Sequence, residues 1–499
     1  MSSATAAAVE PIARKAGLGV LTAACVSALV VNANTSAVTI LLPAISDDTG
    51  APVSQLQWAV TGYMLVGAAV IVTSGALGDI LGRRKIFLAG LALFVASCIL
   101  IALSDTGGGV IAGRMIQGAA GSTILACGMS LLSVDASGPA QMKAITLWGA
   151  ASAAGAAAGP LLGGVLVELS GWQGLFWIDM AIAAACIPVT LLTVKESKDP
   201  NRSKSIDFLG TIMIAVLLVP LVLALSEGTS WGWLSLATLG CFAISIAGAF
   251  GFVFVEQRAE APLVDLRLLR NAVLVGATIA ILIVAGAINA LMYLLSLYFQ
   301  NPAAFGYSAL EAGLATLPAA AAMILVTPLI TPLAVKIGAG RAVALGFAFA
   351  TLGFGVLSFV GASWTYIAFV LPLVLISVGL GIANGPASSA STSSVAPEDT
   401  GAASGISNMS RYVGGSLAVA AAATIYNAAT NNHLKAGASQ ADALAAGLSR
   451  ASIMLTFFSA AGILLLVLLR RFKAKQPRPA DLAAAAAVTT HTIPVPQEA

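Results

Sequence analysis

Charged side chains are scarce in this chain: aspartate, glutamate, lysine and arginine make up 9% of its 499 residues, whereas soluble domains carry about 25%. Because 59% of the residues are hydrophobic, water cannot be the solvent for most of the chain. The apolar residues form runs of about 20 residues, the length that crosses a bilayer core as a helix. The runs lack the alternation of barrel strands. The composition therefore excludes a soluble domain and predicts an all-α integral membrane protein.

Histidine and cysteine are also rare, which excludes several kinds of site. The two histidines, His433 and His491, lie in a predicted loop and in the tail, so the clustered catalytic groups of a membrane enzyme are missing. The five cysteines lie inside apolar runs and indicate small packing residues, not a disulfide framework or a metal cluster. The sequence has no G-x-x-x-x-G-K-[ST] loop for ATP. We therefore expect no enzyme, no cofactor and no metal.

Fourteen apolar runs, bounded by charges or by proline and glycine clusters, are predicted to be transmembrane helices. They lie near residues 18–42, 56–78, 86–104, 109–134, 144–167, 174–194, 206–226, 233–255, 272–299, 312–335, 342–361, 364–388, 402–427 and 450–470. The first run is too long for the apolar region of a signal peptide, so no cleaved signal is expected. Because the number of spans is even, both chain ends are predicted on one side of the membrane.

Lysine and arginine predict the orientation, because cytoplasmic loops carry an excess of both. If the N-terminus is cytoplasmic, the cytoplasmic segments contain Arg14, Lys15, Arg83, Arg84, Lys85, Lys143, Lys195, Lys198, Arg202, Lys204, Arg258, Arg267, Arg270, Lys336, Arg341, Arg470, Arg471, Lys473, Lys475 and Arg478. The outer segments contain only Lys435 and Arg450. This asymmetry predicts a multi-pass protein of the inner (plasma) membrane with both termini in the cytoplasm.

The strongest local signal is a glycine-rich segment with a carboxylate and a basic cluster. It reads Gly75-Ala76-Leu77-Gly78-Asp79-Ile80-Leu81-Gly82-Arg83-Arg84-Lys85, between the second and third predicted helices. Glycines permit a tight turn and close helix approach, and a carboxylate beside basic side chains can form a charge network. We interpret the segment as a conformational latch. Its predicted members are Gly75, Asp79, Gly82, Arg83, Arg84 and, at the inner end of the fourth helix, Asp135.

This segment resembles the signature loop of the major facilitator superfamily, and three other segments agree with it. Gly113-Arg114-Met115-Ile116-Gln117-Gly118 resembles the helix 4 motif, R-x-x-Q-G. Gly155-Ala156-Ala157-Ala158-Gly159-Pro160-Leu161-Leu162-Gly163-Gly164 resembles the helix 5 antiporter motif, G-x-x-x-G-P-x-x-G-G. The segment from Pro397 to Gly405, with Arg411, is similar to the fourteen-helix drug/proton antiporter branch. With these segments, the resemblance extends roughly over residues 18–470.

The resemblance implies two six-helix bundles around a central cavity, with two inserted helices, in a protein that works as a monomer. Residues 332–341 look like a degraded copy of the first motif, as expected for repeated halves. The expected divisions are a cytoplasmic N-terminus (1–17), the N-terminal bundle (18–194), a cytoplasmic loop (195–205), the inserted helices (206–255), a second cytoplasmic loop (256–271), the C-terminal bundle (272–470) and a disordered cytoplasmic tail (471–499).

The fifth predicted helix can also be interpreted without the family. Gly155, Gly159 and Gly163 recur every four residues and form one smooth face, which lets a neighbouring backbone approach closely. Pro160 removes a helix hydrogen bond and bends the path. Together with Gly164 these residues are candidates for a pivot, although ordinary small-residue packing uses the same glycines.

The candidate coupling or cavity residues are Asn34, Arg114, Gln117 and Asp179. In the antiporters that the sequence resembles, the first helix usually carries an aspartate where this chain has Asn34, and asparagine cannot carry a proton. Asn34 offers hydrogen bonds either to a substrate or to a neighbouring helix. No carboxylate is predicted at mid-depth in a helix. Proton coupling is therefore assigned to groups at the membrane edge, first Asp179 and then Glu168 or Glu311, and Arg114 is predicted within reach of the outer interface.

These features predict a secondary active transporter that exports small amphipathic or lipophilic compounds, such as drugs, antibiotics or dyes, in exchange for protons. Its partners are a small-molecule substrate and the lipid bilayer, and no nucleic acid is expected. One alternative within transport is uptake or facilitated diffusion of a small metabolite, which the helix 5 motif disfavours. Outside transport, the alternatives are a membrane enzyme and a receptor, which would usually add a soluble signalling domain.

Overall fold

A computed structural model describes residues 17–135, 138–198, 207–260, 262, 264–395 and 399–473. The predictions for the N-terminal segment up to residue 16, for most of the loop at 195–205, for Pro397 and Glu398, and for the tail from residue 474 onward lie outside the described residues.

The described part contains helices and no strands, as the composition predicts, and fourteen of its helices have 19 or more residues. These are α1 (Leu18–Thr49), α3 (Trp58–Leu81), α4 (Arg83–Ala102), α5 (Gly107–Asp135), α6 (Gly138–Ser170), α7 (Gln173–Thr193), α8 (Phe208–Trp231), α9 (Leu236–Glu256), α10 (Ala272–Gln300), α12 (Leu317–Ile337), α13 (Ala339–Leu357), α14 (Tyr366–Ser393), α15 (Thr400–Lys435) and α16 (Gln440–Lys473). The short helices are α2 (Val53–Leu56), α11 (Ala309–Ala315) and the 3-10 helix η1 (Leu268–Arg270).

Eleven helices in the described part are long and apolar enough to cross a membrane, and α6 makes twelve when its two bent parts count as one span. The other two long helices are α12 and α15. Two polar side chains of α15 bond to neighbouring helices: Arg411 donates to Asn384 and Ser388 of α14, and Thr424 donates to the Leu225 carbonyl of α8. Such bonds between helices reduce the cost of polar side chains inside a membrane-spanning bundle.

Several helices extend beyond the apolar runs that predicted them. α1 continues seven residues past the predicted end at residue 42, α15 continues to Lys435, and α16 begins at Gln440 instead of residue 450. The physical reason is that backbone hydrogen bonding continues into polar turns outside the hydrocarbon. Hydropathy therefore identifies the segment that crosses the membrane but not the ends of the helix. The predicted helix at 312–335 is divided into α11 and α12 at Thr316.

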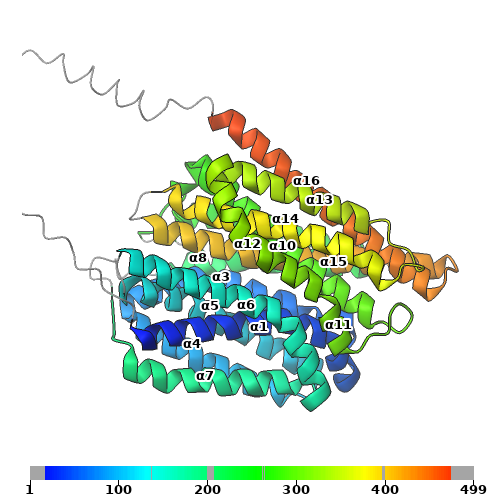
Figure 1. Ribbon diagram of the computed structural model, residues 1–499, viewed down its shortest axis with the longest axis horizontal. Helices are drawn as coiled ribbons and strands as arrows, with labels where there is room; N and C mark the ends of the chain where they lie inside the picture. The colour runs from blue at the N-terminus through cyan, green and yellow to red at the C-terminus, as the bar shows by residue number, and fades with distance from the viewer. Residues whose placement is uncertain are drawn as a thin grey trace, which may run out of the picture.

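The helices pack in two groups with a pair beside them (Figure 1). The first group contains α1 and α3 to α7, and the second contains α10 and α12 to α16. The inserted helices α8 and α9 pack against each other, and α8 also contacts α3 of the first group and α15 of the second. In Figure 1 the first group lies below the second.

Each helix runs between two ends of the molecule, which we name by their residues. The Arg83 end holds the turn from α3 to α4, and the α11 end holds α2, α11 and the turn from α4 to α5. α1 begins and α16 ends at the Arg83 end, on the left of Figure 1. The first and the last described helices therefore begin and end, respectively, at the same end of the molecule.

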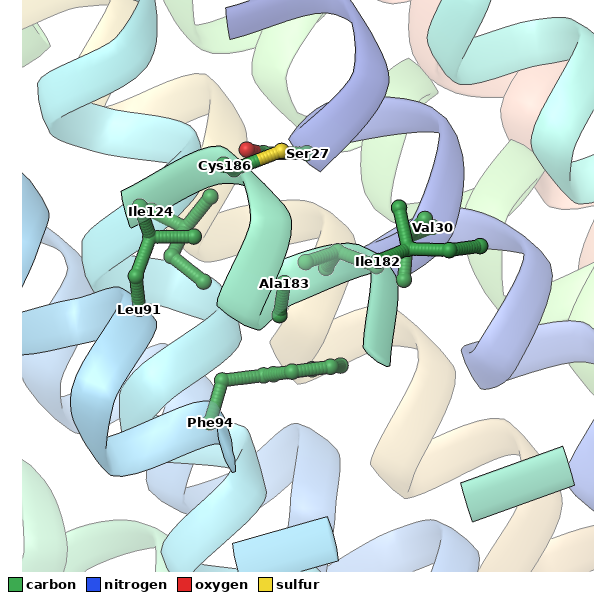
Figure 2. A pocket seen from close by; sticks show the side chains of 9 residues that line it. Ser27, Val30, Leu91, Phe94, Ile124, Ile182, Ala183 and Cys186 are labelled. Carbon is green, nitrogen blue, oxygen red and sulfur yellow. The ribbon is translucent and has the colours of Figure 1, made fainter. Parts of the chain in front are cut away.

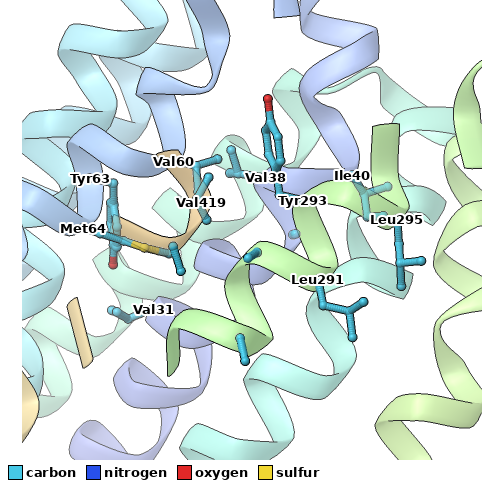
Figure 3. Close-up of a cluster of buried hydrophobic side chains, with 14 of the residues drawn as sticks. Val31, Val38, Ile40, Val60, Tyr63, Met64, Leu291, Tyr293, Leu295 and Val419 are labelled. Carbon is cyan, nitrogen blue, oxygen red and sulfur yellow. The ribbon is translucent and has the colours of Figure 1, made fainter. Parts of the chain in front are cut away.

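Hydrophobic side chains from both groups form one core between α1, α3, α10 and α15 (Figure 3). Val38 of α1, Met64 of α3, Leu291 of α10 and Val419 of α15 are all buried in it. Van der Waals contacts of this kind hold helices together in lipid. Lipid tails are as apolar as these side chains, so the hydrophobic effect does not drive the helices together.

Two hydrogen bonds cross between the groups near the α11 end. Pro43 lies inside α1 and has no N–H, so the Thr39 carbonyl four residues earlier loses its helical donor. The Ser296 hydroxyl of α10 donates to that Thr39 carbonyl at 2.5 Å, and the Gln300 amide donates to the Ile40 carbonyl at 3.0 Å. The proline thus exposes a backbone acceptor that the opposite group uses.

Candidate functional site

A buried polar cluster inside the first group brings together the four predicted coupling residues. Arg114 lies eight residues into α5, and its side chain is fully buried. Its guanidinium donates to the Asn34 side-chain oxygen, to the Gln117 side-chain oxygen and, at 3.1 Å, to the Ala59 carbonyl of α3. These partners bond to Nε and Nη1 of a cation that is costly to hold away from water, while its Nη2 has no partner among the described residues.

Asn34 connects this cation to an anion. Its side-chain oxygen accepts from Arg114, while its amide nitrogen donates to an oxygen of Asp179 at 2.7 Å. Asp179 comes from α7 and is 4% exposed, and Asn34 is 0% exposed. An amide has a donor and an acceptor at one side-chain terminus, so Asn34 bridges the two charged groups and orients both.

The arrangement permits a proton to be held at Asp179. A buried carboxyl group can exist as a neutral acid or as a carboxylate, and Asn34 can adjust its hydrogen bond to either form. The Arg114 charge on the far side of Asn34 stabilises the carboxylate through the bridging amide. The cluster therefore contains a titratable group, a fixed cation and a bridge between them.

The glycine face of α6 packs against the backbone of α1, as the spacing predicts. A Cβ atom on Gly155 would lie 2.1 Å from the Leu29 carbonyl oxygen, and one on Gly159 would lie 2.4 Å from the Ala33 carbonyl oxygen. α6 also bends by 46° between residues 147–156 and 158–170, where Pro160 removes the helical donor to residue 156. Gly163 continues the same face against Ala37 of α1.

Gly164 and Pro160 lie at the contact between the two groups. A Cβ on Gly164 would lie 2.6 Å from the Ala309 carbonyl oxygen of α11, and one on Gly313 would lie 2.7 Å from the Pro160 carbonyl oxygen. The antiporter-like segment therefore contacts α1 on one side and α11, which links α10 and α12 of the second group, on the other. Ser308, which caps α11, also donates to Glu168 of α6 at 2.8 Å.

Three of the predicted latch residues, Asp79, Gly82 and Arg83, meet at the turn between α3 and α4. The Arg83 guanidinium donates to Asp79 at 2.9 Å, and both side chains are largely buried. Gly82 has a φ of 125°, which favours glycine, and a Cβ there would lie 2.6 Å from the Glu196 carboxyl group. A Cβ on Gly75 would meet no atom within 4 Å, so the structure gives no packing reason for glycine there.

Comparison with known proteins identifies the family. A family model described as the Major Facilitator Superfamily matches residues 24–419. The chain belongs to this superfamily.

Several relatives are named as export or resistance proteins. A cephamycin export protein from Amycolatopsis lactamdurans is 32% identical over 419 residues, which cover 82% of this chain and 85% of that protein. A tetracenomycin C resistance and export protein from Streptomyces glaucescens is 29% identical, over 80% of this chain and 74% of that protein. Among solved structures, an auto-inhibited peptide transporter has a TM-score of 0.64 at 15% identity, over 92% of this chain and 97% of that one. This structure shares the fold.

Two positions in this superfamily member differ from the sequence prediction. Asp179, the seventh residue of α7, is not open to water: its side chain is 4% exposed and is bonded to Asn34 of α1. Arg114 does not extend to the interface, because its guanidinium is bonded within the cluster. The sequence did not show this burial, because the distance of a residue from a helix end does not reveal which face of the helix its neighbours cover.

Sequence reasoning missed two residues that complete the cluster, Tyr63 and Cys98. The Tyr63 ring of α3 lies 4.3 Å from the Arg114 guanidinium carbon, in cation–π geometry. Cys98 of α4 accepts from the Gln117 amide at 3.0 Å. Tyr63 and Cys98 each lie inside an apolar run, where an isolated polar atom gives no signal of the partner that folding supplies.

Asp135 and Glu196 also differ from expectation at the Arg83 end. Asp135 accepts from the Gly17 backbone N–H, and the part of the chain that the structure describes shows no bond from it to Arg83. Glu196 was not predicted, but it accepts from the Arg84 backbone N–H at 3.1 Å, at the start of α4. A carboxylate there satisfies a helix N-terminus and complements its dipole.

A small apolar cavity lies one turn along α7 from Asp179 (Figure 2). It is lined by residues that include Val30, Phe94 and Ala183, and it has a volume of about 10 Å³. A volume of that size holds about one water molecule. This cavity is therefore too small for an organic substrate.

Substitution of Asp79 by asparagine is expected to abolish transport without preventing insertion. The change keeps the side-chain size but removes the charge that pairs with Arg83 at 2.9 Å, so the network at the turn is lost. The measurement is transport in membrane vesicles, normalised to the protein detected in the same membranes. Normal transport by Asp79→Asn at normal protein levels would eliminate the latch interpretation.

Proposed function

We propose that this member of the major facilitator superfamily exports small amphipathic or lipophilic compounds in exchange for protons. The proposal rests first on Asp179, a buried carboxyl group that Asn34 links to the Arg114 cation. In this scheme Asp179 holds the exchanged proton. The export direction is supported by the relatives, two of which are named for export, and by the antiporter-like segment of α6.

The two helix groups are proposed to rock about their contact surface. Contacts between them near the α11 end include the bonds to Thr39 and Ile40 and the packing of α11 on α6. We infer that these contacts close the α11 end in the state described, and that they separate when substrate leaves. The lysine and arginine distribution supports an outward-facing α11 end and a cytoplasmic Arg83 end.

The energy source and the direction of transport can both be tested in one bacterial host. A susceptible strain with and without the gene is tested against antibiotics and cationic dyes, with and without a proton uncoupler. The proposal expects a raised inhibitory concentration for at least one compound, and faster dye accumulation when the uncoupler is added. Lower resistance in the expressing strain would support uptake instead, and resistance that persists with the uncoupler would exclude proton coupling.

Removing the hydrogen bonds between the groups is expected to open the α11 end. The double variant Ser296→Ala and Gln300→Leu loses both bonds, each worth about 0.5–1.5 kcal/mol. Their combined loss of about 1–3 kcal/mol shifts the equilibrium by about 5- to 150-fold. Spin labels at exposed Asp47 of α1 and Lys435 of α15 measure the separation of the groups after replacement of the native cysteines.

The expected result is a larger fraction of long distances in the double variant than in the parent. Asn432→Leu, an exposed change at the same end, serves as the control and should leave the distances unchanged. Identical distance distributions in the parent and the double variant would show that these two bonds do not hold the end closed.

A further inference from the structure

A polar cavity of about 380 Å³ lies at the α11 end, apart from the Arg114 cluster. Its walls come from α2 and the start of α3, the end of α8 and the end of α15. The first group, the inserted pair and the second group therefore all contribute to it. Ligand pockets have volumes of about 300–1,000 Å³, so the cavity is large enough for a small molecule or a headgroup.

Two buried polar atoms in this wall have no hydrogen-bond partner among the described residues. The Gln57 side chain is 3% exposed, and its side-chain oxygen is unpaired. The Ser226 hydroxyl is also buried and unpaired. A buried polar atom without a partner costs about 1–3 kcal/mol. The Gln57 oxygen is an acceptor, so the missing partner at this position is a hydrogen-bond donor.

The wall of the cavity also carries a negative charge, from Glu227. Glu227 is the one charged side chain among the eleven residues that line the cavity, and the others are amides, hydroxyls, Ala428 and Trp58. One Glu227 oxygen accepts from the Ser230 hydroxyl at 2.9 Å. A carboxylate, an unpaired amide oxygen and an aromatic ring all favour a cation that donates hydrogen bonds.

We propose that this cavity binds a primary ammonium group. Its three N–H donors suit the Glu227 carboxylate and the Gln57 oxygen, and Trp58 adds an aromatic side chain to the wall. The same chemistry occurs in an aminophospholipid headgroup and in a soluble organic amine. Because the cavity has walls from all three sets of helices, the bound ammonium stabilises their arrangement at the α11 end. The inference depends neither on the direction of transport nor on its energy source.

The test measures thermal unfolding of the purified full chain in nanodiscs. One arm compares discs of phosphatidylglycerol mixed with phosphatidylethanolamine against discs in which phosphatidylcholine replaces the phosphatidylethanolamine. The other arm adds hexylamine to discs of phosphatidylglycerol and phosphatidylcholine, with hexanol as the uncharged control. We expect a saturable rise in Tm with phosphatidylethanolamine or with hexylamine, because a ligand that binds the folded state raises Tm by mass action.

The variants decide whether the rise comes from this cavity. Glu227→Gln removes the charge, and Gln57→Met removes the acceptor at similar volume, so each is expected to lose the ammonium-dependent rise. Asp105→Asn removes an exposed carboxylate in the turn from α4 to α5 at the same end and should retain it. An equal rise in Glu227→Gln and in the parent, or no rise with either ammonium source, would overturn the proposal.

Discussion

Replacement of Asp179 by asparagine is expected to abolish proton-driven efflux while leaving the protein folded in the membrane. The side chain is 4% exposed and bonded to Asn34, so an amide of the same size can occupy the position, but it cannot carry a proton. The measurement is the initial rate of ethidium transport in vesicles with an imposed pH gradient. We expect the Asp179→Asn rate to fall to that of vesicles without the protein.

Exchanging the two side chains provides a sharper form of this test. Asn34 and Asp179 are joined by a 2.7 Å hydrogen bond, so the double variant Asn34→Asp with Asp179→Asn keeps one amide and one carboxyl group in contact. The exchanged carboxyl then lies beside Arg114, at the α1 position where the related antiporters usually have an aspartate. Recovery of proton-driven transport in the double variant is the expected result.

Glu168→Gln is the matched control for Asp179→Asn, because it also replaces a carboxyl group by an amide. Glu168 lies at the α11 end of α6 and accepts from Ser308, outside the buried cluster. Loss of the Glu168 carboxylate should leave proton-coupled transport unchanged. If Asp179→Asn transports ethidium at the parental rate under the same gradient, the proton is carried elsewhere.

Substitution of Gly159 by alanine is the second change with a large expected effect. The added Cβ would lie 2.0 Å from the Ser36 hydroxyl oxygen and 2.4 Å from the Ala33 carbonyl oxygen. The α1 backbone cannot move aside easily, and such overpacking costs about 1–3 kcal/mol. We expect a lower Tm in detergent and a severe loss of transport.

Gly149→Ala on the same helix is the control. A Cβ there meets no atom within 4 Å, and alanine is favoured over glycine in a helix by about 1 kcal/mol. This variant should be as stable as the parent or more stable, with transport retained. Equal stability of Gly159→Ala and Gly149→Ala would contradict the close contact of α1 with α6.

Much of the fold follows from the sequence because the bilayer imposes a simple length rule. The fourteen apolar runs each correspond to a long helix, and the four-residue spacing of Gly155, Gly159 and Gly163 predicts a helix that packs closely. Helix ends were less predictable. The polar turns that extend α15 to Lys435 and start α16 at Gln440 are stabilised by backbone hydrogen bonds, which hydropathy does not record.

The buried cluster was only partly predictable. Its members Arg114 and Gln117 share one helix face at a spacing of three, which the sequence displays. The contact between Asn34 and Asp179 joins residues 145 positions apart, and it depends on how α1 and α7 pack. The missing aspartate of α1 therefore looked like a loss of the titratable group, whereas the structure supplies a carboxyl group from the adjacent helix.

Proton release on substrate binding tests the proposed role of Asp179 most directly. Ethidium is added to the purified protein in weakly buffered detergent solution, and a pH indicator records protons released. The account predicts saturable release from the parent, none from Asp179→Asn, and release restored in the double variant with Asn34→Asp. Equal proton release from Asp179→Asn and the parent would contradict it.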